Sequence, residues 1–77
     1  MRKIEFNGVA VEYDERCLRS WKWQKAIAVG TDAKRIEAIE TLLLGKDEEV
    51  ADKIGDDMEV MGELIAAIVE DNGKAKN

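Results

Sequence analysis

Cys17 and Ser20 are the only cysteine and the only serine of this sequence, and each has the chemistry of a nucleophile. Either would need an adjacent base, most often a histidine, and the chain contains no histidine. Ser20 has two cationic neighbours, Arg19 and Lys22, but serine–lysine catalysis requires a buried lysine, which nothing in the sequence indicates. Cys17 lies near the start of a predicted helix, yet on its apolar face. A surface serine and a buried, unreactive cysteine are therefore the favoured interpretations.

Carboxylates gather between residues 47 and 59, where a metal site is conceivable. A calcium-binding loop places glycine at its sixth position, but counting from Asp47 gives Asp52 there, and counting from Asp52 gives Asp57. The glycine-rich loops that hold nucleotides are absent as well. The sequence thus predicts a protein that is not an enzyme, with no catalytic residues, no cofactor and no metal. We interpret the acids as caps and solvated helix faces: Asp47, Glu48, Glu49, Asp52, Asp56, Asp57 and Glu59.

The segment 16–25 mixes cations with both tryptophans of the chain. Such a mixture can bind single-stranded nucleic acid, and it is equally typical of protein–protein hot spots. The net charge of −5 repels phosphate, so a protein partner is favoured and nucleic acid is unlikely. Whether Trp21 belongs to the core and Trp23 covers a helix junction stays open. The predicted partner-binding residues are Arg16, Arg19, Lys22, Trp23, Ile27, Met58 and Met61.

A chain of 77 residues is short enough to predict a single domain with a thin core. Its one cysteine cannot close an intrachain disulfide, which suggests a reducing, cytoplasmic location. No apolar stretch follows Met1, so no signal peptide is expected, and no run reaches the ~20 residues of a membrane span. Residues 1–35 carry a net charge of +3 and residues 36–77 of −8, an asymmetry that favours pairing of the halves or head-to-tail association.

Residues 1–13 predict a β-hairpin, because Asn7-Gly8 is a strong signal for a type I′ turn. A two-residue loop there pairs Phe6 with Val9, Glu5 with Ala10, Ile4 with Val11 and Lys3 with Glu12. This register places four apolar residues on one face, which must then pack on helices.

Helical spacing predicts four helices after the hairpin. The first runs from about Glu15 to Val29 with Asp14 as its N-cap. One of its faces holds Cys17, Leu18, Trp21, Ala28 and Val29, and a second apolar strip with Trp23 and Ile27 lies opposite. The second helix is capped by Thr31 or Asp32 and ends at Gly45, and its apolar stripe is Ile36, Ile39, Leu42 and Leu43. The third helix spans Asp47–Ile54. The last helix is capped by Asp56 and stops at Asn72-Gly73.

The predicted fold class is therefore α+β, with an N-terminal two-stranded β-hairpin packed on a bundle of three to four α-helices. One domain covers residues 1–77, divided into a hairpin (1–13), a helical part (14–72) and a flexible tail (73–77).

The layout of the chain resembles the small tail assembly chaperones of siphophages and prophages of Gram-positive bacteria. The similar segments are 4–14, Ser20-Trp21-Lys22-Trp23-Gln24-Lys25-Ala26, 38–45, Met61-Gly62-Glu63-Leu64 and 73–77. The resemblance implies that the protein binds the long, helical tape measure protein during tail assembly in the host cytoplasm. Proteins of that family are often made in a short form and in a longer form produced by ribosomal frameshifting. Exposed apolar surface would also support self-association into a homo-oligomer. The alternatives are a small phage nucleic-acid-binding or regulatory protein and a structural head–tail subunit.

Overall fold

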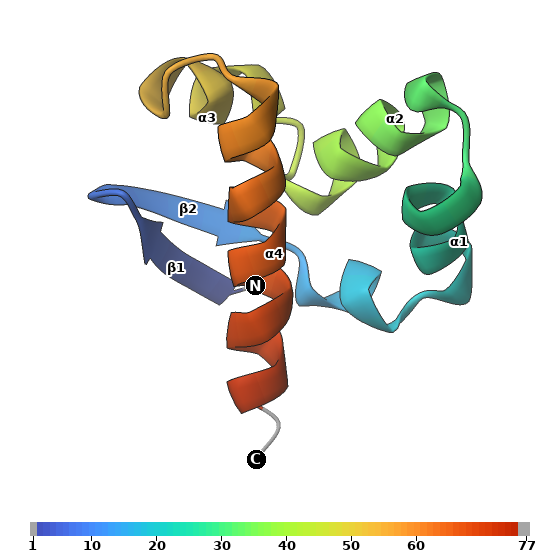
Figure 1. The fold of residues 1–77 in the computed structure, drawn as a ribbon. Coiled ribbons are helices and arrows are strands. Elements are labelled where there is room, and N and C mark those ends of the chain that lie inside the picture. Colours follow the sequence, from blue (N-terminus) through green and yellow to red (C-terminus); the bar gives the residue numbers. More distant parts are fainter. Residues whose placement is uncertain (1, 76–77) are drawn as a thin grey trace.

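The computed structural model describes residues 2–75, with side chains described as far as residue 73. It confirms the predicted α+β fold, in which an N-terminal antiparallel hairpin is followed by helices (Figure 1). In chain order the elements are β1 (Arg2–Phe6), β2 (Val9–Tyr13), the 3-10 helix η1 (Glu15–Arg19), α1 (Trp21–Val29), α2 (Asp32–Leu42), α3 (Asp47–Lys53) and α4 (Met58–Ala75).

The hairpin has the predicted register, from Phe6 opposite Val9 to Lys3 opposite Glu12, and one further pair joins Arg2 to Tyr13. Asn7 and Gly8 both have positive φ angles, 51° and 79°, as a type I′ turn requires. The inward face of β2 carries Val11 and Tyr13, which are 1% and 0% exposed. The hairpin therefore contributes its apolar face to the core.

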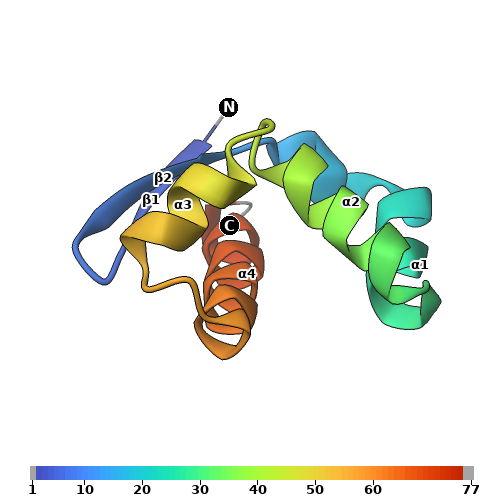
Figure 2. The same ribbon diagram turned by 90° about the horizontal axis from the view of Figure 1, so that it is seen from above.

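The core lies where the hairpin, η1 and the end of α2 meet α4. Helix α4 crosses in front of the strands, while α1 and α2 extend to one side (Figure 1). Viewed from above, the hairpin, α3 and α4 lie on one side, and α1 forms the opposite edge (Figure 2). The largest side chains with almost no exposed surface are Tyr13, Leu42, Leu43, Leu64, Ile68 and Val11.

The predicted single helix over residues 15–29 is wrong, because the chain bends at Ser20. Ser20 has extended backbone angles (φ −85°, ψ 123°), ends η1 and is the N-cap of α1. Its hydroxyl oxygen accepts a hydrogen bond from the backbone N–H of Trp23 at 3.2 Å. Asp14 caps η1, as predicted, by accepting from the N–H of Arg16. Two short helices therefore replace one long helix.

The turn from α1 to α2 is tight. The N–H of Gly30 donates to the carbonyl of Ala26, and a Cβ at Gly30 would collide with that carbonyl oxygen. Thr31, one of the two predicted caps, then accepts from the N–H of Lys34 and starts α2. Glycine and threonine together let α2 fold back onto α1.

The last helix differs from the prediction at both ends. Its capping carboxylate belongs to Asp57, which accepts from the N–H of Glu59 at 2.7 Å, whereas Asp56 has a positive φ of 51° in the preceding turn. At its other end α4 continues through Asn72 and Gly73 to Ala75. Residues 73–75 of the predicted tail therefore belong to α4, and residues 76 and 77 lie outside the described part of the chain.

Candidate partner-binding groove

An apolar groove lies between α2, α3 and the first turns of α4. It encloses about 290 Å³, at the lower end of the range for small-molecule pockets. That volume suits one or two large side chains of a partner. Its walls are Ile36 and Ile39 from α2, Asp47, Glu48 and Ala51 from α3, and Met58, Met61 and Gly62 from α4.

The groove has an apolar rim exposed to solvent and a floor that belongs to the core. Met58 is 90% exposed and Ile36 is 59% exposed, both unusual for large apolar side chains. Ile39 and Met61 are half-buried and pack against the core. Further along α4 the same helical stripe reaches Val69, which is 47% exposed. The open side of α4 thus carries apolar surface over most of its length.

The groove is bordered by negative charge. Asp47 and Glu48 form part of its wall. Residues 47–63, which contain α3 and the start of α4, hold eight acids against a single cation, Lys53. The Lys53 ammonium forms an ion pair with the Glu49 carboxylate at 3.4 Å, so this cation is paired within α3. The local field therefore favours cationic partners.

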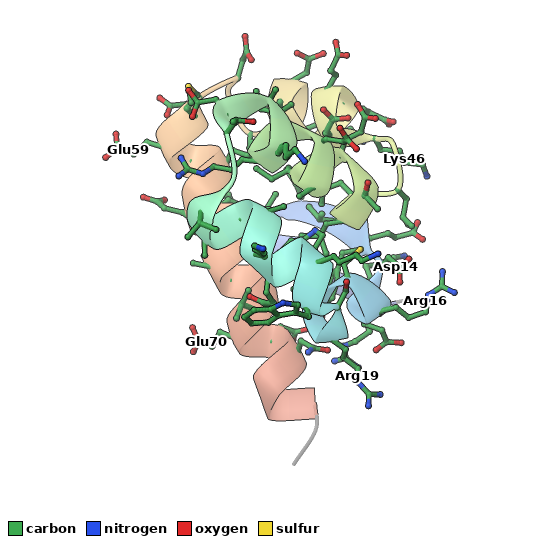
Figure 3. All side chains as sticks on the ribbon, turned by 90° about the vertical axis from the view of Figure 1, so that its right-hand side faces the viewer. Asp14, Arg16, Arg19, Lys46, Glu59 and Glu70 are labelled. Carbon is green, nitrogen blue, oxygen red and sulfur yellow. The ribbon has the colours of Figure 1, made fainter. Side chains whose placement is uncertain are left out.

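A second, basic surface lies on η1, α1 and the start of α2. Residues 16–35 hold six Lys and Arg residues against one acid, Asp32. Lys22, Lys25 and Lys34 line a shallow hollow of about 460 Å³ between α1 and α2. Figure 3 shows Arg16 and Arg19 on the opposite side of the molecule from Glu59 and Glu70 of α4.

The predicted partner-binding residues fall into three places. Met58 and Met61 line the groove, and Arg16, Arg19 and Lys22 are exposed on η1 and α1. Arg16 forms a fork with Asp14, with both hydrogen bonds at 3.0 Å, and this contact lowers the pKa of the Asp14 carboxyl. Trp23 and Ile27 pack into the core instead. The structure therefore does not bring the seven residues together.

Trp23 is the candidate residue with the least exposed surface. It is only 7% exposed, and its indole N–H donates to the carbonyl of Ala38 at 2.8 Å. Trp21, which the helical pattern placed on one face with Cys17 and Leu18, is 77% exposed. Trp23 therefore holds α1 against α2, and Trp21 is the tryptophan available to a partner.

Four groove residues were not predicted to bind a partner: Ile36 and Ile39, which belong to the apolar stripe predicted for the second helix, and Ala51 and Gly62. Two signals in the sequence pointed to accessible apolar residues. One was the methionines of α4, which suit an adaptable surface. The other was the preference of serine for N-cap positions, because a helix that starts after Ser20 changes the face on which Trp21 lies.

The potential nucleophiles have structural roles. Cys17 is 8% exposed, and burial raises the pKa of its thiol, which opposes thiolate chemistry. The Ser20 hydroxyl is engaged in its cap. Within residues 2–75, no three His, Cys, Asp or Glu side chains come together as a metal would need. None of the described helices has the length and apolar content of a membrane span.

Comparisons with models of protein families, with curated proteins and with solved structures found no match to this chain.

Proposed function

We propose that this chain is a non-enzymatic protein-binding module whose groove receives the apolar stripe of a helix in a partner protein. The observation that carries the proposal is the 90% exposure of Met58 above a floor formed by Ile39 and Met61. Methionine adapts its shape to different apolar partners, and an amphipathic helix laid into a groove uses anchors of this kind. The acidic wall adds a preference for helices with flanking Lys or Arg.

The resemblance to tail assembly chaperones suggests the partner. A tape measure protein is long and helical, and its apolar stripes are uncovered until the tail tube forms around it. A small domain with an open groove would shield such stripes in the cytoplasm of the host cell. The proposed role is therefore that of a phage or prophage tail assembly chaperone.

One observation favours a second candidate, a nucleic-acid-binding regulatory protein. Trp21 is exposed between Arg19 and Lys22, an arrangement on which a base can stack. The acidic groove opposes this role, since the net charge of the chain is −5. Binding of a labelled single-stranded oligonucleotide that weakens with salt and is lost in Trp21→Ala would favour it.

The groove is tested by co-expressing the chain with the tape measure protein of the phage that encodes it. The measured quantity is the amount of tape measure protein that stays soluble and co-purifies. Met58→Glu and Ile36→Glu place a charge in the groove, so each should lower co-purification at least about tenfold, as loss of a hot-spot residue does. Val29→Glu is the matched control, because Val29 is also apolar and 71% exposed but lies on α1 outside the groove.

Equal capture by the wild type and both groove variants would contradict the groove as the binding site. Failure of the wild-type chain to keep the tape measure protein soluble would contradict the chaperone role itself. Circular dichroism of each variant checks that the fold is intact.

A further inference from the structure

Helix α1 presents an outward face that combines apolar anchors with cations. Trp21 is 77% exposed and Val29 is 71% exposed, and Lys22 and Lys25 are exposed between them. Trp21, Lys25 and Val29 follow one another at intervals of four residues, so they lie along one stripe of the helix. Trp23 and Ala26 point the other way, toward α2 and the core. The outward face of α1 is therefore a short, cationic, amphipathic surface.

This face has the properties that the groove on the same molecule favours. The groove offers exposed Met58 and Ile36 beside the acids Asp47 and Glu48. Helix α1 forms the outer edge of the molecule in the view from above, where it is free to meet another body (Figure 2). The two surfaces match both in apolar character and in charge.

The charge match extends beyond the residues that line the groove. Residues 16–35, around α1, carry six cations and one acid, whereas residues 47–63, around the groove, carry eight acids and one cation. Opposite fields of this size raise the rate of encounter and orient two copies before contact. Helix α1 contributes no residue to the groove, so its cations are free to attract the groove of another molecule, and two copies turned like face to like face would repel.

We propose that the groove takes a second copy of this chain, with the outward face of α1 of one copy docked between α2, α3 and α4 of the next. Trp21 and Val29 then cover the exposed methionine and isoleucine of the groove, and Lys22 and Lys25 lie against Asp47 and Glu48. This contact between copies uses the groove that the proposed function assigns to a partner protein, its client, but it forms without the client. A client helix and a second copy therefore compete for it.

The contact is head-to-tail, so each docked copy still offers one free groove or one free α1 face. Repetition of such a contact gives a ring if the rotation closes and an open chain if it does not. Helix α1 has nine residues and is about 13 Å long, so the buried area is small and the association weak. Assembly should therefore depend on both protein and salt concentration.

Sedimentation velocity of the full chain, without any client, tests the proposal over a protein concentration series at low and high salt. Two charge-reversed variants are compared with the wild type: Lys22→Glu with Lys25→Glu on α1, and Asp47→Lys with Glu48→Lys in the groove. We expect each variant alone to associate at least about tenfold more weakly than the wild type. An equimolar mixture should regain association, because each reversed surface then meets its opposite.

The matched control is Glu5→Lys with Glu12→Lys, which changes the net charge as the groove variant does but on the exposed face of the hairpin. It should associate as the wild type does. Val29→Glu should weaken self-association without lowering client capture, whereas the groove variants should lower both, which separates this inference from the proposed function.

A wild-type chain that stays monomeric at low salt and high concentration would overturn the inference, even if it binds a client. Self-association that persists in both reversed variants, or that their mixture fails to regain, would overturn it equally.

Discussion

Helix α4 has two sides that differ in almost every respect. On the side facing the hairpin, Leu64 and Ile68 are completely buried. The same side is fastened by polar contacts, since the Tyr13 hydroxyl donates to Asp71 Oδ2 at 2.8 Å. Arg2 donates to the Tyr13 oxygen at 3.2 Å and lies 3.4 Å from the Asp71 carboxylate. The hairpin side is therefore closed by both packing and hydrogen bonds.

The other side of α4 is open. Met58 at its start and Val69 three turns on are exposed, and the groove at Met58 is bordered by the acids Asp47 and Glu48 as well as by apolar residues. A domain of this size buries a limited area and has little stability to spare. The comparison indicates that stability is concentrated on the hairpin side, so the groove side is free to serve binding.

The largest expected effect comes from truncating the closed side. Leu64→Ala removes a completely buried side chain and should lower the free energy of unfolding by about 2–5 kcal/mol. Met58→Ala, on the same helix but 90% exposed, should change it by less than about 0.5 kcal/mol. Urea unfolding followed by circular dichroism measures both. Similar losses for the two variants would mean that the two sides do not differ as described.

The two tryptophans give a smaller effect with a closely matched control. Trp23→Phe removes the hydrogen bond to the Ala38 carbonyl and part of a buried ring, and should cost about 1–3 kcal/mol. Trp21→Phe is the same chemical change at an exposed position and should leave stability nearly unchanged. Thermal unfolding of the two variants decides the assignment. A more destabilised Trp21 variant would contradict the placement of Trp23 in the core and of Trp21 at the surface.

The smallest effect concerns the contact between Tyr13 and Asp71. Burial, followed by the hydrogen bond to Asp71, raises the pKa of Tyr13 above its ordinary value of about 10. The folded protein therefore favours the neutral phenol of Tyr13 more than the unfolded chain does. The contribution of Tyr13 to the free energy of unfolding is complete below about pH 10 and is lost as the pH rises through the folded-state pKa. Tyr13→Phe should cost about 1 kcal/mol at neutral pH.

The stability difference between wild type and Tyr13→Phe should then shrink as the pH rises above about 10. Urea titrations at neutral and alkaline pH measure it. Cys17, whose thiol pKa is also raised, is present in both proteins, so its effect cancels in the difference. A difference that grows with pH would contradict the assignment.

The hairpin could be predicted to the residue because its information is local. Asn7-Gly8 specifies the turn, and alternation then fixes every pair. The faces of the next segment could not be predicted, because they depend on one residue. An unbroken helix would align Trp21 with Cys17, but the bend at Ser20 restarts the helical rotation, and Trp23 turns inward instead.

The groove was only partly predictable for a different reason. Helical periodicity identifies an apolar stripe but does not say whether another element covers it. The predicted stripe of α2 is buried at Leu42 and left open at Ile36, where no element packs over it within the described residues. Only the arrangement of α2 beside α4 distinguishes a core residue from a groove residue.

The placement of the two tryptophans makes the chain its own optical probe. The indole of Trp23, shielded from water, should emit at short wavelength and resist quenching by iodide, while that of Trp21 should emit at long wavelength and be quenched. A change in the blue component would then report loss of the fold, and a change in the red component would report contact at α1. A single emission spectrum of the unlabelled protein therefore separates unfolding from contact at α1.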